Sequence, residues 1–223
     1  MREFRIFGHR GSPTRFPENT LASFDEALRA GADGFETDLR LLSDNAAVLY
    51  HDDEFADDTI ERLSTSQLSE RGAVIERLSD LERYAKRTTM VLEVKRSKWE
   101  EALVEHVGRW PNIVVASFDH SLIENLHRRA VSFSLGITTF GYIIDIAAYA
   151  ARLGATWCFP AYRYVDEEMV TSLHQRGVKV VPWTPNRVRE WEALREIGCD
   201  GVITDLPHEA VGWRNGERPS RPR

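Results

Sequence analysis

Carboxylate and histidine side chains stand near the ends of three apolar runs in this sequence. Glu36 and Asp38 lie two residues apart in "GFETDLRL", and Glu93 lies in "MVLEVK". Side chains two apart on a strand face the same way, and acidic groups on an inward face are costly unless they are paired or bind a cation. We therefore expect the three carboxylates to converge on one point, where oxygen-only ligation suits Mg²⁺ or Ca²⁺. His9, after the run "FRIF", could supply acid or base chemistry beside them.

Simpler interpretations of the same residues stay open at this point. Glu36 and Asp38 could form salt bridges with Arg40 or Lys95 and hold layers of a barrel together. A single histidine in such a run is more often a hydrogen-bonded core residue than a catalytic one. A buried Lys95 at a strand end could instead form a Schiff base, as lysines do in barrel aldolases.

The elements that carry these residues alternate between short β-like runs and amphipathic helical runs. In "TLASFDEALRA", for example, Leu21, Phe24 and Leu28 share one helical face. Strict alternation of eight strands with helices predicts an α/β fold, a single (β/α)₈ TIM barrel, with chemistry at the carboxyl ends of the strands. A doubly wound open sheet is the second choice, because GxGxxG is absent after the first strand. The predicted strands are 4–7, 34–41, 90–95, 113–118, 132–138, 156–161, 179–184 and 201–205.

Glycine follows four of the predicted helices, one to three residues before a strand begins. This position suits the left-handed conformation in which many helices end. The four residues are Gly31, Gly154, Gly177 and Gly198.

One segment breaks the alternation. "SDNAAVLYHDDEF" follows the second strand too closely for a helix, and we predict an extra strand at "AVLYH" after a turn. From residue 54 to about residue 87 we predict a loop and then one helix, a small insertion that looks abbreviated. The barrel is expected to span residues 1–212, and the Pro/Arg-rich residues 213–223 are expected to form a flexible C-terminal tail.

Composition excludes several classes of protein. The net charge of −6 provides no basic field for nucleic acid or an anionic bilayer. No apolar run approaches the roughly 20 residues that span a membrane, and the N-terminal residues are too polar for a signal peptide. Cys158 and Cys199 lie in apolar contexts, which favours two buried free thiols in a reducing compartment over one disulfide. We expect a cytoplasmic protein without stable membrane insertion; its oligomeric state is open.

Several motifs together resemble the glycerophosphodiester phosphodiesterase family. They run in the family's order from residue 4 to about residue 207: "HRG", "PENT", "GADGFETDLRL", "HDD", "LEVK", "VVPWTPN" and "GVITDLP". The resemblance implies a (β/α)₈ barrel that hydrolyses phosphodiesters of glycerol with a divalent cation.

The resemblance also implies a role for each matching residue. Glu36, Asp38 and Glu93 would be the metal ligands, and His9 and His51 would be the acid–base pair. Arg10 and Lys95 would contact the phosphate. Trp183 would line the wall of the pocket. Within "PENT" we expect structural roles, with Glu18 bracing the "HRG" turn and Asn19 or Thr20 capping a helix. We interpret Asp205, after the last strand, as a turn or helix-capping residue.

The predicted function is metal-dependent hydrolysis of glycerophosphodiesters to glycerol 3-phosphate and an alcohol. We assign His9 as general base and His51 as general acid, and leave open whether the substrate 2-hydroxyl or water attacks. The substrate is a small molecule. A shortened insertion would open the mouth to bulkier groups, so a lysophospholipase-D-like activity is the first alternative. A metal-free Schiff-base aldolase using Lys95 and a non-catalytic phosphate-binding barrel are the alternatives of other classes.

Overall fold

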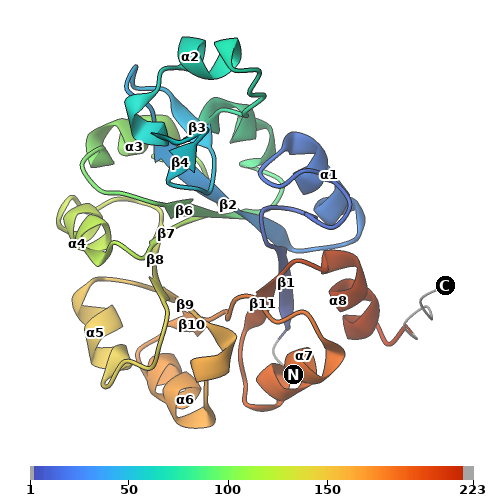
Figure 1. The fold of residues 1–223 in the computed structure, drawn as a ribbon. Coiled ribbons are helices and arrows are strands. Elements are labelled where there is room, and N and C mark those ends of the chain that lie inside the picture. The colour runs from blue at the N-terminus through green and yellow to red at the C-terminus, as the bar shows by residue number, and fades with distance from the viewer. Residues whose placement is uncertain (1–2, 218–223) are drawn as a thin grey trace.

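Eight parallel strands form a barrel in the computed structural model, which describes residues 3–217 (Figure 1). Their order around the barrel is β10-β9-β8-β7-β6-β2-β1-β11. The strands are β1 (Arg5–Gly8), β2 (Gly34–Leu41), β6 (Thr89–Val94), β7 (Ile113–Ser117), β8 (Ser134–Thr139), β9 (Trp157–Pro160), β10 (Lys179–Val180) and β11 (Gly201–Thr204).

The barrel closes between β10 and β11 through irregular hydrogen bonds. The amide of Ile203 donates to the carbonyl of Pro182 (2.9 Å), and Trp183 forms parallel bridges to Ala161 and Ile203. The predicted TIM barrel is therefore confirmed, with every predicted strand present within a few residues of its expected bounds.

Helices cover the outside of the barrel, as Figure 1 shows. The first is capped by Thr20, whose hydroxyl accepts from the amide of Ser23 (3.2 Å), and is followed by Gly31 with φ 93°. All four glycines predicted to follow helices have positive φ. No helix among the described residues is long and apolar enough to cross a membrane. The helices are α1 (Leu21–Arg29), α2 (Thr65–Glu70), α3 (Glu100–Val107), α4 (His120–Arg128), α5 (Ile146–Arg152), α6 (Glu167–Gln175), α7 (Val188–Glu196) and α8 (Pro207–Arg214).

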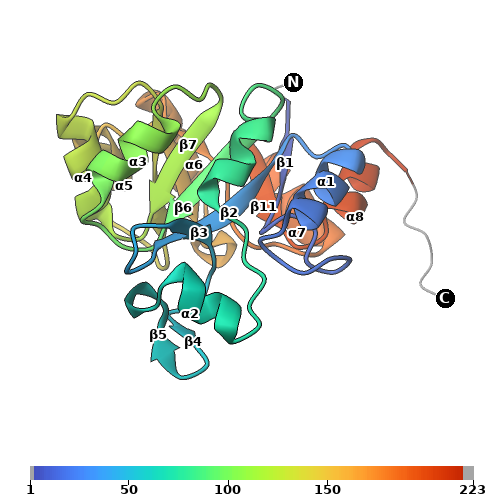
Figure 2. The same cartoon turned by 90° about the horizontal axis from the view of Figure 1, so that it is seen from above.

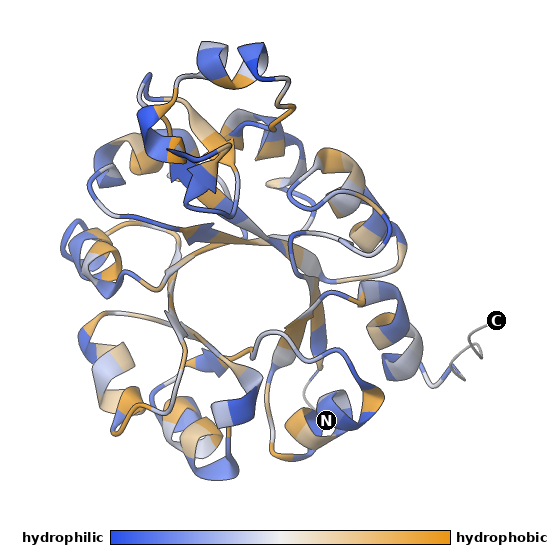
Figure 3. Cartoon of the chain, in the orientation of Figure 1, coloured by the Kyte–Doolittle hydropathy of each residue, from blue (hydrophilic) through white to orange (hydrophobic). Residues whose placement is uncertain are grey.

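Alternate residues of each strand build two different cores. On β1, Ile6 packs outward beneath the helices, whereas Phe7 faces the interior with Trp157 and Phe159. Figure 3 shows hydrophobic residues along the barrel wall and hydrophilic residues toward the periphery. On β2 the outward residues Phe35 and Leu39 are fully buried in the helix layer. The acidic pair of "GFETDLRL" alternates with these outward residues and therefore points into the barrel.

The segment after β2 differs from the prediction. The extra strand exists as β3 (Ala47–Leu49), antiparallel to β2. Residues 54–87, however, are not a loop and one helix. They contain the hairpin β4 (Glu54–Phe55) and β5 (Asp58–Thr59), the 3₁₀ turn η1 (Ile60–Arg62), α2, and a 3₁₀ segment η2 (Leu78–Tyr84) that packs on the barrel.

This insertion has a small core of its own. Leu63 and Leu68 pack with Ile60, Val48 and Leu42. Figure 2 shows β4, β5 and α2 as a lobe at one end of the barrel.

The last helix extends beyond the boundary placed at residue 212. Trp213 packs edge-to-face on Phe4 (5.6 Å between ring centroids), and Arg214 forms an ion pair with Asp33. Residues 213 and 214 therefore belong to the barrel rather than to the predicted tail. The indole of Trp213 provides apolar area that α8 buries against Phe4. The end of that tail, residues 218–223, lies outside the described residues.

Both cysteines are free and buried, as predicted. Burial raises the pKa of Cys158 to about 12, and burial with the charge of Asp200 does the same for Cys199. At pH 8 the thiolate fraction would then be on the order of one part in 10⁴. We expect neither thiol of the folded protein to react with Ellman's reagent at pH 8 within minutes, and two thiols to react after unfolding. Rapid reaction of either thiol in the native state would contradict this burial.

A second prediction concerns Gly8, where β1 turns toward the mouth of the barrel. A Cβ at this position would lie 2.1 Å from the carbonyl oxygen of Gly11 and 2.9 Å from the Cβ of Ala27. Gly8→Ala should therefore lower the free energy of unfolding by about 1–3 kcal/mol in urea titrations. The matched control is Gly212→Ala in α8, whose Cβ meets only ordinary contacts, and it should raise stability by up to about 1 kcal/mol. Equal effects of the two changes would refute the steric account.

Candidate active site

A cavity of about 250 Å³ opens at the carboxyl ends of the barrel strands, and all eight residues predicted for the site line it. They are His9, Arg10, Glu36, Asp38, His51, Glu93, Lys95 and Trp183. The remaining lining residues are Val91, Ala116, Phe118, Thr138, Phe159 and Ile203.

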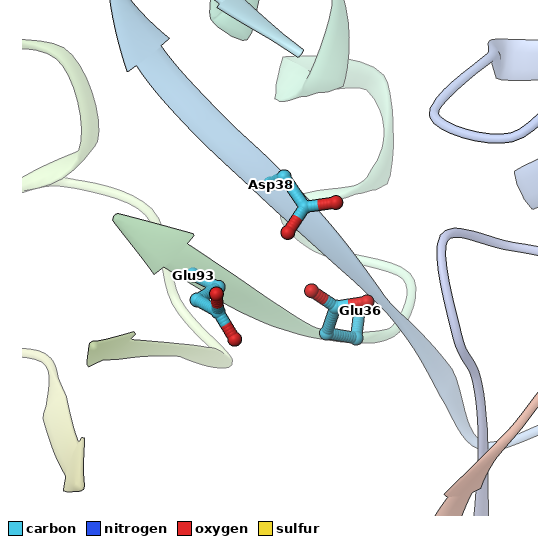
Figure 4. A group of neighbouring side chains, drawn as sticks. All are labelled: Glu36, Asp38 and Glu93. Carbon is cyan, nitrogen blue, oxygen red and sulfur yellow. The ribbon is translucent and has the colours of Figure 1, made fainter. Parts of the chain in front are cut away.

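Three carboxylates meet on the wall formed by β2 and β6. Asp38 and Glu93 are register partners in the parallel pair, and Glu36 lies two residues earlier on the same face. One oxygen from each of the three groups lies within 4.8 Å of the others, and Figure 4 shows the carboxylates turned toward a common space. Glu36 and Asp38 are only 3% and 1% exposed. The convergence expected from the spacing is therefore present.

Burial and neighbouring charges shift the pKa values of the carboxylates in this cluster. Burial, helped by the charges of Asp38 and Glu93, raises the pKa of Glu36 to about 8. Burial also acts to raise the pKa of Asp38, but Lys95 and Arg10 outweigh it and keep that pKa below its usual value. The donor set fits a hard divalent cation, because it consists of carboxylate oxygens alone and needs positive charge to offset their repulsion.

Lys95 lies against two of these carboxylates. Its Nζ donates to Asp38 (2.6 Å) and to Glu93. Burial lowers its pKa, but the two negative charges outweigh burial and raise the pKa above the ordinary lysine value. The ammonium is therefore strongly favoured, which suits contact with an anion and opposes the neutral amine that a Schiff base requires.

Arg10 is fixed by a tight turn. Gly11 N donates to Gly8 O (3.2 Å), and both Arg10 and Gly11 have positive φ, 52° and 91°. The Arg10 amide donates to Glu36 (3.0 Å), and its guanidinium contacts both oxygens of Glu18 at 3.0 Å and Asp38 at 3.2 Å. The prediction that Glu18 braces this turn is confirmed.

His9 is held by Asp205, which we predicted to be a turn or helix-capping residue. Its Nδ1 lies 2.6 Å from Asp205 Oδ1, and its Nε2 lies 4.0 Å from Glu36. Asp205 makes no side-chain cap of α8, so the capping interpretation is wrong. Asp205 follows the inward-facing Ile203 by two residues, and this spacing on the last strand was the signal that could have placed it at the mouth.

The contact sets the state of the imidazole. Burial lowers the pKa of His9, but the hydrogen bond to Asp205 and the charge of Glu36 outweigh burial and raise it. Burial also opposes ionisation of Asp205, yet the hydrogen bonds from His9 and Asn186 keep its pKa low. An ionised Asp205 accepts from Nδ1–H, which leaves His9 Nε2 free to accept a proton.

Asn186 and Asn19 hold two of the acidic side chains, Asp205 and Asp38, in place. Asn186 Nδ2 donates to Asp205 (2.6 Å), while its Oδ1 accepts from the Asp205 amide (2.9 Å). Asn19 Nδ2 donates to Asp38 (2.9 Å), and its Oδ1 accepts from Thr37 Oγ1 (2.7 Å). Helix capping belongs to Thr20 alone, so Asn19 is a positioning residue that sequence reasoning missed.

His51 reaches the cavity from the turn after β3. Its side chain is 37% exposed, and its Nδ1 lies 2.7 Å from Asp52. Buried Arg40 fixes this turn: its Nη2 donates to the carbonyl oxygen of His51 (2.6 Å) and to Asp53 (2.7 Å). Arg40 therefore does not pair with the acidic cluster. It shares the inward face of β2 and positions the second histidine instead.

The opposite wall of the cavity is nearly apolar. It comes from β7, β8, β9 and the segment after β10, and includes Phe118, Phe159 and Trp183. The indole Nε1 of Trp183 donates to the carbonyl of Phe159 (3.0 Å), so the ring offers apolar surface. Thr138 adds one buried hydroxyl with no hydrogen-bond partner among residues 3–217. The cavity thus has a charged side and an apolar side.

Carboxylates and histidines at the carboxyl ends of the strands of a (β/α)₈ barrel are typical of the active sites of barrel enzymes. The family model described as "Glycerophosphoryl diester phosphodiesterase family" matches residues 9–102 and 78–209. The chain belongs to this family and is a phosphodiesterase.

Named relatives support this membership. A glycerophosphodiester phosphodiesterase of Bacillus altitudinis is 29% identical, covering 94% of this chain and 98% of the relative. A protein of the same name from Caldanaerobacter subterraneus subsp. tengcongensis is 25% identical, covering 92% and 96%.

Solved structures show the same fold. The glycerophosphodiester phosphodiesterase of Thermotoga maritima has a TM-score of 0.83 at 24% identity, covering 96% of this chain and 99% of that one. An Oleispira antarctica phosphodiesterase, solved with the product sn-glycerol-3-phosphate, has a TM-score of 0.82 at 22% identity, covering 96% and 98%.

The contact between Asp205 and His9 can be tested by substitution. Asp205→Asn keeps the shape of the side chain but removes the charge that orients and stabilises a protonated His9, so we expect phosphodiesterase kcat to fall about 10- to 100-fold with little change in KM. The control is Asp44→Asn, in an exposed turn where the carboxylate contacts Thr65. Full activity of Asp205→Asn would show that His9 needs no such partner.

Proposed function

We propose that the protein hydrolyses glycerophosphodiesters to glycerol 3-phosphate and an alcohol, using one divalent cation, Mg²⁺ or Ca²⁺. The observation that supports this most is the cluster of Glu36, Asp38 and Glu93 within 4.8 Å, in one cavity with His9 and His51. The product bound to the Oleispira antarctica relative supports the choice of glycerol 3-phosphate.

The three carboxylates would hold the cation. When bound, such a cation offsets the negative charge on the non-bridging phosphate oxygens and orients the phosphoryl group. Lys95 and Arg10 line the same wall and bring fixed positive charge to the phosphate. Both side chains already contact Asp38, so their positions are set before substrate arrives.

Proton transfer is assigned to the two histidines. His9, with Nδ1 committed to Asp205, takes the proton of the attacking oxygen at Nε2. His51, with Nδ1 against Asp52, presents Nε2 to the oxygen of the leaving alcohol and protonates it as the P–O bond breaks. Trp183 closes the apolar wall, where the part of the substrate that carries no charge would lie.

A metal-free aldolase fits this site poorly. A Schiff base needs a neutral lysine, but Lys95 contacts two carboxylates and has a raised pKa. A Schiff base would also give no role to the acidic cluster or to the His9–Asp205 contact.

The proposal predicts that glycerophosphocholine is hydrolysed, with glycerol 3-phosphate and choline released in equal amounts. EDTA should abolish turnover and added Mg²⁺ or Ca²⁺ should restore it. His9→Asn and His51→Asn should each lower kcat by about 10²–10⁴-fold, because each removes one proton transfer.

His106→Asn is the matched control, since this histidine is exposed on α3 and its Nδ1 lies 2.7 Å from Ala102 O of the same helix. Turnover that survives EDTA, or a His9 variant as active as the His106 variant, would overturn the proposal. Parallel circular dichroism spectra would show that each variant is folded.

A further inference from the structure

A single hydroxyl, that of Thr138, stands among the apolar residues that line the far wall of the catalytic cavity. Thr138 is 3% exposed, and its Oγ1 is buried without a hydrogen-bond partner among residues 3–217. Buried polar groups in folded proteins nearly always have a partner, and an unpaired one lowers stability. In a cavity that receives a ligand, such a hydroxyl is explained by a partner that the ligand brings.

The place of Thr138 in β8 directs its side chain toward the site. Ile137 packs outward beneath the helices, so its neighbour Thr138 faces the interior of the barrel. In the strand register, Glu93 is level with Ala116 of β7, and Ala116 is level with Gly136. Thr138 follows Gly136 by two residues and therefore lies one inward layer closer to the mouth than the carboxylate of Glu93.

Two side chains fix the end of the strand that carries this hydroxyl. His120 Nε2 lies 2.9 Å from the carbonyl oxygen of Thr138, and its Nδ1 lies 2.9 Å from the hydroxyl of Tyr149. Because a carbonyl only accepts, Nε2 is the donor, and in the neutral ring Nδ1 accepts from the tyrosine. The Thr138 hydroxyl takes no part in these contacts, so rotation about its Cα–Cβ bond can turn it toward a ligand without breaking a hydrogen bond.

The proposed mechanism decides which half of the substrate reaches this wall. His51, which would protonate the leaving alcohol, enters the cavity from the turn after β3, the partner of β2. β6 and β7 separate β2 from β8, so Thr138 lies on another wall of the cavity. The leaving alcohol must approach His51, so the glycerol half extends from the phosphorus toward the other wall. There the indole of Trp183 already donates to Phe159, which leaves the Thr138 hydroxyl to pair with the glycerol.

We infer that the Thr138 hydroxyl hydrogen-bonds a free hydroxyl of the substrate's glycerol, so that the protein selects diesters of glycerol over diesters of simple alcohols. The inference rests on the proposed function for the positions of the phosphate and of the leaving alcohol. In the free protein the hydroxyl is unpaired, and substrate binding supplies its partner. Thr138 is therefore a specificity-determining residue and transfers no proton.

Thr138→Val tests the unpaired state, because valine has nearly the same shape and no hydroxyl. The free protein should melt about 2–4 °C higher in a calorimetric scan, since the change removes a buried polar group that has no partner. The matched control is Thr139→Val, because Thr139 is also 3% exposed and unpaired among residues 3–217 but does not line the cavity. It should raise Tm by a similar amount. A lower Tm for Thr138→Val alone would show that its hydroxyl has a structural role and would overturn the inference.

The selection itself is measured as a ratio of two dissociation constants. Calorimetry with Mg²⁺ or Ca²⁺ present gives Kd for glycerol 3-phosphate and for propyl phosphate, which lacks both hydroxyls. Thr138→Val should lower the preference for glycerol 3-phosphate about tenfold, the effect of one lost hydrogen bond to a buried group. Thr138→Ser, which keeps the hydroxyl, and Thr139→Val should retain the preference. In turnover of glycerophosphocholine the defect of Thr138→Val should appear in KM more than in kcat, because the contact is made before the chemical step.

The outcomes separate this inference from the proposed function. An unchanged ratio in Thr138→Val, with glycerophosphocholine still hydrolysed, overturns the inference alone. A ratio that falls as expected, without hydrolysis of any glycerophosphodiester, retains the hydroxyl contact and overturns the proposed function. An equal fall of the ratio in Thr138→Ser or in Thr139→Val assigns the effect to the packing of β8 and refutes the contact.

Discussion

Repulsion among three buried carboxylates is the constraint around which this protein is organised. Two strands of a closed barrel cannot move apart, so Glu36, Asp38 and Glu93 are held within 4.8 Å by the same hydrogen bonds that form the wall. Such crowding is expensive unless positive charge is supplied. Lys95 and Arg10 supply part of it, while burial, together with the charges of Asp38 and Glu93, still raises the pKa of Glu36 to about 8. A buried acidic cluster of this kind is compatible with a divalent cation, which would supply the rest.

The neighbouring contacts follow from that constraint. Asn19 contacts Asp38, the Arg10 amide contacts Glu36, and Asp205 contacts His9, so each of these cavity side chains has a hydrogen-bond partner on another segment of the chain. These partners gather the charge on one side of the mouth. The other side is lined by apolar and aromatic side chains, so the cavity has one charged side and one apolar side.

The strand spacing was sufficient to predict the barrel and the clustered acids, because a period of two fixes which side chains face inward. The spacing could have placed Asp205 at the mouth, but it could not pair Asp205 with His9 or Asn186 with Asp205, since these partners lie 196 and 19 residues apart and only closure of the barrel brings them together. The prediction of a loop and one helix for residues 54–87 failed for another reason. The small core that Leu63 and Leu68 build with Val48, on a neighbouring strand, decides the structure of this segment, and this core cannot be read from local spacing.

Cation binding to the acidic cluster is the most direct test of this account. Isothermal titration of the metal-free protein with Mg²⁺ and with Ca²⁺ should show one site per chain for at least one of the two ions. Glu93→Gln should weaken that site at least about tenfold, because it removes one charged ligand and leaves the fold intact. Binding of equal strength in Glu93→Gln, or no binding by the wild-type protein, would contradict the central claim.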